Sequence, residues 1–299
     1  HDNTIRLHTL FVPQESGVKV RLRGISAVSA DVAWASGREG TVLRTVDGGK
    51  HWQAMKVPGA DELDFRDVEG FDADTAAVLS IGSGETSRVY RTEDGGKTWI
   101  LALQNKNPQA FFDCMAFDGQ QGWMMGDPVD GRFEIYRTGD AGKSWKPMSG
   151  PKAEEKEAAF AASGTCIALT RAGPLVVTGG TLARAHGRAP GPDDEGWSAT
   201  NASKSTAAES KGYFSAAPSE GAAFLVGGDY KAEFSAGIAA RIGVGYMHFV
   251  ENEKVVDGAE VREGNDITKP LKRLSVGFAK LTSLQELAPP RGYRSALWI

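Results

Sequence analysis

The sequence predicts an all-β protein, a β-propeller of four-stranded blades. Three observations support this class: one eight-residue segment recurs at nearly constant spacing, short segments rich in β-branched and aromatic residues precede each copy, and the 299-residue chain contains 37 glycines and 7 tryptophans. A period in the middle forties with short strands and turns is typical of propeller blades. Because propellers commonly exceed 200 residues as one unit, we expect a single domain over residues 1–299.

The repeated segment has the pattern T-x-D-x-G-K-x-W, and its tryptophans lie 47 and then 46 residues apart. An aspartate in a tight turn accepts hydrogen bonds from backbone amides a few residues on, and glycine adopts the positive φ of a sharp reversal. Each copy is therefore predicted to form a turn before the last strand of a blade, with its tryptophan packing between blades. The residues with this structural role are Asp47, Gly49, Trp52, Asp94, Gly96, Trp99, Asp140, Gly142 and Trp145.

Strand-like segments at matching positions define the blades. Predicted third strands cover residues 41–44, 88–91 and 134–137, and predicted second strands, each ending in glycine, cover 32–37, 77–82 and 122–126. A fourth blade contains strands near 165–169 and 175–178. The five readable blades lie near residues 20–57, 64–104, 110–148, 158–201 and 211–250.

The pattern weakens toward the C-terminus. The turn segment due after Arg241 is missing, so we expect an irregular fifth blade, and residues 242–288 packed less well than 20–150. A hairpin is expected around 251–253. Residues 6–12 alternate apolar and polar side chains like a strand and are expected to close the ring.

Residues 151–159 combine a leading proline with strong helix formers, which predicts a short helix with a solvated charged face.

The three turn segments resemble the Asp-box, or BNR, repeat of sialidase-like propellers. The longer context is similar to bacterial relatives of the photosystem II stability/assembly factor family, over residues 16–241 and again over 289–299. The segments that carry this similarity are 111–117, 125–133, 158–166, 226–230 and 292–295. The resemblance implies a seven-bladed propeller that helps to assemble a membrane protein complex on its lumenal or periplasmic side.

Composition excludes several functions. The formal net charge is -4 and no Lys/Arg block stands out, which argues against nucleic acid as a partner. No apolar run of about 18 residues predicts membrane insertion. The five histidines are scattered, so no metal is expected, and no glycine-rich segment opens a helix as a nucleotide cofactor requires. The chain begins with His1 rather than Met, as expected for a processed periplasmic or secreted protein, although an excerpted chain would begin in the same way.

Cys114 and Cys166 fall at nearly equivalent positions on the predicted first strands of blades three and four. First strands line the centre of a propeller, where neighbouring blades come closest. Two interpretations follow: a pair of separate buried thiols, favoured by the burial tendency of free cysteine, or a disulfide that would persist in an oxidising compartment.

The favoured function is a non-catalytic scaffold that binds a protein partner through loops on a rigid ring. Candidate binding residues follow the predicted second strands or belong to the C-terminal matching segment: Arg38, Glu39, Asp127, Asp130, Arg132, Asp229, Tyr230, Lys231 and Arg294. The alternative is a sialidase-like glycoside hydrolase or a carbohydrate-binding propeller. The chemical types for hydrolysis are supplied by Asp67, Asp113, Glu39, Tyr230, Arg132 and Arg294, which form no recognisable motif, so no catalytic residue is assigned.

Overall fold

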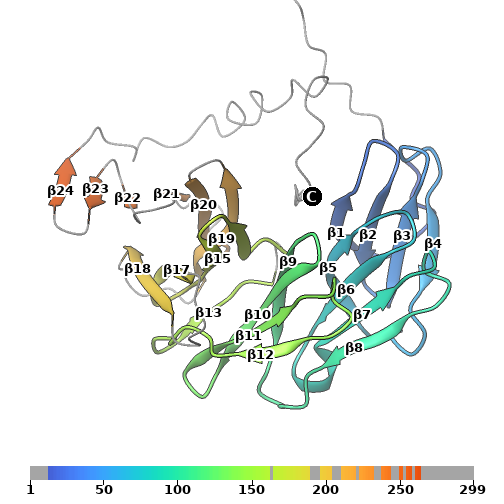
Figure 1. Cartoon of the computed structure of the whole chain (residues 1–299), viewed down its shortest axis with the longest axis horizontal. Coiled ribbons are helices and arrows are strands. Elements are labelled where there is room, and N and C mark those ends of the chain that lie inside the picture. Colours follow the sequence, from blue (N-terminus) through green and yellow to red (C-terminus); the bar gives the residue numbers. More distant parts are fainter. Residues whose placement is uncertain are drawn as a thin grey trace, which may run out of the picture.

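The computed structural model describes residues 13–161, 164–188, 196–203, 210–219, 222–231 and 237–243, and the backbone of 249–251, 254–257 and 260–263. Its sheets follow one another along an arc, from β1 to β4 through the middle of the chain to β21 (Figure 1). The all-β propeller prediction is confirmed. Among the described residues, no helix is long and apolar enough to cross a membrane.

The first three sheets share one four-stranded antiparallel order. The first contains β1 (Leu22–Ala27), β2 (Ala33–Gly37), β3 (Thr41–Thr45) and β4 (Gln53–Lys56). The second contains β5 (Asp64–Gly70), β6 (Ala76–Ile81), β7 (Arg88–Thr92) and β8 (Ile100–Gln104), with the short 3-10 helix η1 (Gly84–Thr86) between β6 and β7. The third contains β9 (Phe112–Asp118), β10 (Gln121–Val129), β11 (Arg132–Thr138) and β12 (Lys146–Met148).

The fourth sheet is regular and the fifth is not. The fourth contains β14 (Ile167–Thr170), β15 (Gly173–Val177), β17 (Ala183–Arg188) and β18 (Trp197–Ser203). The fifth joins β19 (Lys211–Ser219), β20 (Ala222–Asp229) and β21 (Ile238–Gly243) to two upstream two-residue strands, β13 (Glu157–Ala158) and β16 (Gly179–Gly180). The predicted irregularity of the fifth blade is confirmed.

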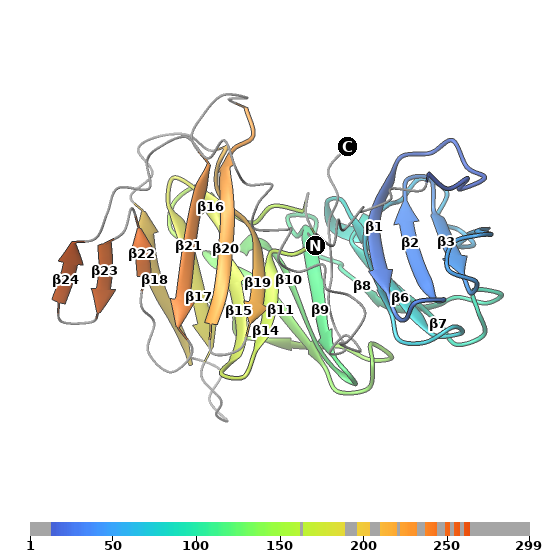
Figure 2. The same ribbon diagram turned by 90° about the horizontal axis from the view of Figure 1, so that it is seen from above.

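First strands lie next to one another along the arc. β1 contacts β5, β5 contacts β9, β9 contacts β14, and β14 contacts β19 (Figure 2). Apolar side chains from successive sheets fill the space between them, such as Val42 of β3 with Phe65 of β5, and Leu79 of β6 with Met115 of β9. Each sheet therefore buries its faces against its neighbours, as propeller blades do.

A three-stranded sheet of β22 (Phe249–Glu251), β23 (Lys254–Asp257) and β24 (Glu260–Glu263) follows. β22 and β23 pair antiparallel with Glu251 opposite Lys254, which confirms the predicted hairpin. The expected ring-closing strand at 6–12 and the C-terminal segment with Arg294 lie outside the described residues. The predicted poorer packing of residues 242–288 stays a prediction, because most of the side chains that would show it lie outside the described residues.

The three Asp-box turns have one hydrogen-bonding pattern. Asp94 Oδ1 accepts from the Thr98 amide at 2.9 Å and from the Thr92 hydroxyl at 2.9 Å, while Thr92 Oγ1 accepts from the Gly96 amide at 2.9 Å. Asp47 and Asp140 make the equivalent contacts. The predicted role of these aspartates is confirmed.

These bonds also hold the box carboxyls ionised. The pKa of Asp94 falls to about 2, first through the Thr98 side chain and then through its amide, and the pKa of Asp47 reaches the same value through the His51 amide and side chain. Glycine takes the left-handed conformation at Gly49, Gly96 and Gly142, with φ of 81°, 84° and 81°. The third box differs in one respect, because Ala141 adopts φ 57° where the other two have glycine.

We expect Thr138→Val to lower the free energy of unfolding by about 1–3 kcal/mol, because the variant leaves buried polar groups unpaired. Thr138 is buried, its hydroxyl donates to Asp140 Oδ1 at 2.7 Å, and its oxygen accepts from the Gly142 amide at 3.0 Å. Urea denaturation measures the change. Thr170→Val is the matched control at a partly exposed threonine, and equal losses in both variants would contradict a specific role of the box.

Two of the three box tryptophans, Trp99 and Trp145, pack between sheets, as predicted. Trp145 is 9% exposed and lies in one cluster with Ala77 of the preceding sheet. Trp99 packs against the cluster that contains Trp34 of the first sheet. Trp52 belongs to none of the apolar clusters of the described residues, and its indole N–H donates to Gln14 Oε1 at 2.9 Å.

The predicted helix at 151–159 is wrong. This segment instead turns at Glu155 and Lys156 and enters β13 at Glu157, whose side chain is buried rather than solvated. Glu157 Oε1 accepts from Arg184 Nε at 2.9 Å and lies 3.2 Å from His186 Nε2, and Arg184 Nη2 also binds Oε2. This tertiary ion pair outweighs the helix propensity of the segment.

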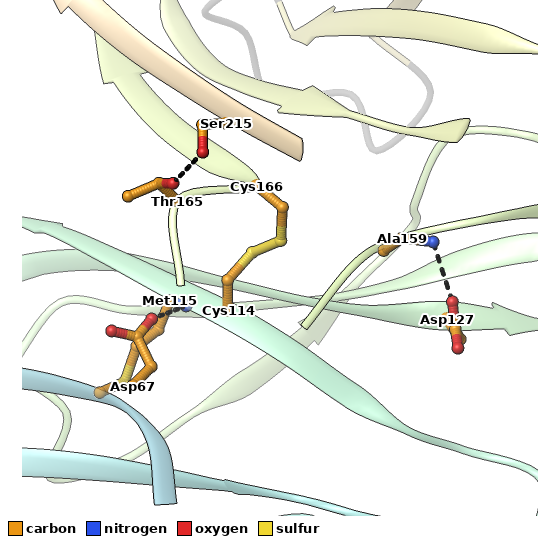
Figure 3. Close-up of a disulfide and its surroundings, with 8 residues drawn as sticks. All are labelled: Asp67, Cys114, Met115, Asp127, Ala159, Thr165, Cys166 and Ser215. Atoms are coloured by element: carbon orange, nitrogen blue, oxygen red, sulfur yellow. Dashed lines mark hydrogen bonds between the residues drawn. A yellow bond between two sulfur atoms is a disulfide. The ribbon is translucent and has the colours of Figure 1, made fainter. Parts of the chain in front are cut away.

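A disulfide joins Cys114 of β9 to Cys166, which directly precedes β14 (Figure 3). The Cα atoms are 6.1 Å apart and both residues are fully buried. The favoured interpretation as separate thiols is therefore wrong, and the alternative is confirmed. The physical reason is that β9 and β14 are neighbouring first strands, so equivalent positions on them lie within bridging distance.

Candidate functional site

Because the strands of each sheet run antiparallel, the loops that connect them lie alternately at the two ends of the propeller. The Asp-box turns and the loops from first to second strands share one end, because the Gly48, Gly95 and Ala141 amides donate to the Asp31, Asp74 and Gln120 carbonyls, each at 2.9 Å. The loops from second to third strands and the segments that cross from sheet to sheet share the other end, which we call the crossover face. For example, the Gly40 amide donates to the Leu63 carbonyl at 3.0 Å.

The structure places the described candidate binding residues on the crossover face. Arg38 and Glu39 follow β2, Asp130 follows β10, and Tyr230 and Lys231 follow β20. Three more are at the adjoining strand ends: Asp127, Arg132 and Asp229. They do not form one group, because they belong to the first, third and fifth sheets.

A β-bulge occurs at the same place in four of the first strands. The extra residues are Arg23 in β1, Arg66 in β5, Asp113 in β9 and Phe214 in β19, each near the end of the strand that adjoins the crossover face. Bulges redirect a side chain and are frequent next to functional sites. The repeat thus supplies one variable position at this face in the first, second, third and fifth sheets.

An arginine cluster lies where the first two sheets meet at this face. Arg23 is partly buried, and burial together with the charges of Arg66, Arg21 and Arg38 lowers its pKa. The Asp64 carboxylate acts on Arg23 in the opposite direction, and it pairs with Arg66 at 3.1 Å and with Arg38 at 3.5 Å. Arg23 therefore lies among three further guanidinium groups whose charges oppose its own, which makes this part of the face cationic.

Sequence reasoning found only Arg38 of this cluster. Arg21 and Arg23 precede or begin a first strand, and Arg66 is more than 40 residues further on. The bulges at Arg23 and Arg66 interrupt the alternation of inward and outward side chains along β1 and β5, and no simple sequence pattern marks them. The recurrence of arginine near the start of two successive first strands was the available indication.

Two carboxylates considered for hydrolysis, Asp67 and Asp113, are used inside the scaffold. Asp67 accepts from the Val68 and Met115 amides, each at 2.9 Å, so it joins β5 to β9 (Figure 3). Asp113 is 1% exposed and accepts from the Ala161 amide. Glu39 and Tyr230 lie on the first and fifth sheets, and Arg132 Nη1 donates to the Gly150 carbonyl at 2.9 Å. The structure does not gather these residues into an acid and base pair.

Two acidic residues of the third sheet hold the crossover segment to the fourth. Asp127 Oδ1 accepts from the Ala159 amide at 2.9 Å, and Asp113 accepts from the Ala161 amide, so both neighbours of Phe160 are fixed. Asp113 Oδ2 is buried without a hydrogen-bond partner in the described part of the chain. Burial, and then the charge of Asp127, raise the pKa of Asp113 well above its ordinary value.

We expect Asp113→Asn to flatten the pH dependence of stability above about pH 4. A carboxyl whose pKa is raised in the folded state stays protonated while the unfolded chain ionises, so stability falls as pH rises toward the raised pKa. The wild-type protein should therefore lose unfolding free energy relative to the variant between pH 4 and 8, measured by urea denaturation. Asp130→Asn, at an exposed site, is the control, and parallel pH profiles for wild type and Asp113→Asn would contradict the expectation.

Repeated four-stranded sheets, three Asp-box turns and a variable crossover face define an Asp-box β-propeller. Residues 11–178 match the family model described as photosynthesis system II assembly factor YCF48. The chain belongs to this family.

Solved structures give similar folds at low identity. YCF48 bound to D1 peptide matches with 16% identity and a TM-score of 0.38, covering 74% of this chain and 77% of that chain. YCF48 from Cyanidioschyzon merolae matches with 18% identity and a TM-score of 0.49, covering 81% and 74%. An ancestral GH74 enzyme matches with 12% identity and a TM-score of 0.52, covering 75% of this chain but 31% of the enzyme. A search of curated proteins returns no match.

Proposed function

We propose that this chain is a non-catalytic propeller that binds an acidic segment of a protein partner at the crossover face and thereby assists the assembly of a membrane protein complex. The arginine cluster carries the proposal. Arg38 and Arg66 pair with Asp64 at one end of the propeller, and Arg23 feels the positive charges of Arg66, Arg21 and Arg38. Membership of a family described as an assembly factor supports the same role.

Arginine suits this role because its planar guanidinium binds carboxylates in a bidentate manner and stays charged when partly buried. The Arg38 side chain is 55% exposed and remains available to a partner, whereas Arg66 is 17% exposed and holds Asp64. An incoming carboxylate would replace the repulsion among the arginines by attraction. Such electrostatic complementarity raises the association rate and selects the partner.

An extracytoplasmic location, periplasmic or secreted, belongs to the same proposal. A buried disulfide between first strands supports it, because disulfides persist in oxidising compartments and are rare where thiols are kept reduced. Fractionation of the native cells followed by immunoblotting tests the location. Recovery of the protein in the cytoplasmic fraction would contradict it.

The binding proposal is tested with two labelled, amidated hexapeptides, hexaglutamate and hexalysine, by fluorescence anisotropy at low and physiological salt. We expect hexaglutamate to bind, and Arg23→Glu combined with Arg38→Glu to weaken its binding by about tenfold or more. Lys97→Glu, an exposed charge reversal at the Asp-box end, is the matched control. Equal binding to wild type and to the double variant would overturn the role of the cluster.

A further inference from the structure

Three aromatic rings meet on the crossover face between the fourth and fifth sheets. The Phe160 and Phe214 ring centroids are 4.8 Å apart, and Tyr230 lies 5.9 Å from Phe160 and 6.4 Å from Phe214. Phe160 comes from the crossover segment, Phe214 is the bulged residue of β19, and Tyr230 follows β20. Tyr230 is 59% exposed, and because it touches two other aromatic rings it is part of a contiguous apolar patch rather than a single exposed residue.

The chain fixes Phe160 from two sides. Asp127 and Asp113 hold the amides of its neighbours, as described above. Beneath the ring, Gly179 and Gly212 leave room, because a Cβ atom added at either position would lie 2.4 Å or 2.8 Å from Phe160 Cε2. The two glycines are also paired across β16 and β19. Phe160 is therefore held in one place before any partner arrives.

The turn that carries Tyr230 is equally well held. Asp229 Oδ1 accepts from the buried Ser210 hydroxyl at 2.6 Å and from the Lys231 amide at 3.0 Å, and the Tyr230 amide donates to the Ser210 carbonyl at 3.3 Å. A preorganised aromatic surface loses little conformational entropy on binding, which is the property of interface hot spots. The cluster is thus built as a contact surface for an apolar group.

A lysine lies beside the exposed ring. Lys231 Nζ lies 5.8 Å from the Tyr230 ring centroid, and both Lys211 and Lys231 act on Asp229 and lower its pKa, after the Ser210 hydroxyl and the Lys231 amide. Asp229 is occupied by its turn, so two lysines face one engaged carboxylate. A ligand that carries a carboxylate beside its apolar group complements this arrangement.

We propose that Phe160, Phe214 and Tyr230 form a second binding site on the crossover face, which takes an apolar side chain followed by an acidic residue in an extended segment of a protein partner. The proposal rests on the proposed function, because it adds a contact for the same kind of partner. The arginine cluster would attract acidic segments broadly, whereas the aromatic cluster selects those with an apolar residue next to the acid.

Three labelled pentapeptides with amidated C-termini test the proposal by fluorescence anisotropy: Gly-Ser-Phe-Glu-Gly, Gly-Ser-Ala-Glu-Gly and Gly-Ser-Phe-Lys-Gly. We expect the first to bind about tenfold more tightly than the other two, and Tyr230→Ala and Lys231→Glu each to remove that preference. Ile100→Ala is the control, because Ile100 is a 66% exposed apolar residue on β8. Both Tyr230 and Lys231 are exposed, so their variants should fold normally, which circular dichroism verifies.

The outcomes separate this site from the arginine cluster. If the Phe-Glu preference survives Arg23→Glu with Arg38→Glu and is lost in Tyr230→Ala, the second site stands even where the arginine proposal fails. Equal affinities for the three peptides, or an unchanged preference in Tyr230→Ala, would overturn it. Competition by methyl α-fucoside, with no peptide preference, would also overturn it in favour of a carbohydrate site.

Discussion

Simultaneous replacement of Cys114 and Cys166 by alanine is expected to lower the free energy of unfolding by about 4 kcal/mol. The bridge spans a sequence separation of 52 residues and joins the first strands of two successive sheets. Without it the unfolded chain gains the freedom of that loop, and the largest described apolar cluster, which contains both cysteines, loses its cross-link. Urea denaturation of the double variant, compared with the wild-type protein, measures the difference.

A reductant provides the control for this prediction. Dithiothreitol should lower the denaturation midpoint of the wild-type protein and leave the Cys114→Ala/Cys166→Ala variant unchanged. Because both sulfurs are fully buried, reduction should become fast only under conditions that unfold the chain. A wild-type protein whose midpoint is insensitive to reductant, with two free thiols by alkylation and mass spectrometry, would show that the bridge is absent.

Replacing Glu157 by glutamine is expected to cost about 3 kcal/mol, the second largest effect, because the buried Arg184 guanidinium then keeps only the exposed Glu154 carboxylate, 3.6 Å from Nη1, as a counter-charge. Arg184 and His186 are both buried and both contact the Glu157 carboxylate, and the Thr178 hydroxyl donates to it at 2.5 Å. Burial alone would raise the pKa of Glu157, but hydrogen bonds from His186, Arg184 and Thr178 hold it at about 2. Thermal and urea denaturation at pH 7 measure the loss.

Glu155→Gln is the matched control, since Glu155 is exposed two residues away on the same turn. It should change stability by less than about 0.5 kcal/mol. The Glu157→Gln variant should also lose order where β13 pairs with β16, detected by faster amide hydrogen exchange there. Equal stability of the two variants would contradict the importance of this ion pair.

The Asp boxes were predictable because their chemistry is local. Thr92, Asp94 and Gly96 satisfy one another within five residues, so pattern and structure coincide. Glu157 was not predictable, because its partners Arg184 and His186 are nearly 30 residues away and make a helix-forming segment turn instead.

In the candidate site too, the features that depend on local sequence were predictable and those that depend on distant contacts were not. The sequence indicated the face through loops that follow second strands, since that depends only on strand order. The arginine and aromatic clusters depend on bulges and on contacts between sheets, such as the bulge at Arg66 and the ring contact of Phe160 with Phe214. A pattern with a period of two does not reveal a register shift, and a single sequence does not show which distant segments meet.

The link between each Asp box and its neighbouring loop has a consequence for how such a chain can diversify. The box amide at Gly48, Gly95 or Ala141 bonds only to a main-chain carbonyl, so the bond survives whichever residue supplies that carbonyl. Asp31, Asp74 and Gln120 occupy the position in the three sheets. The residue that supplies the carbonyl can therefore change without loss of this bond, whereas Ser29 and Asp72, whose side chains accept from amides of the same loops, are constrained.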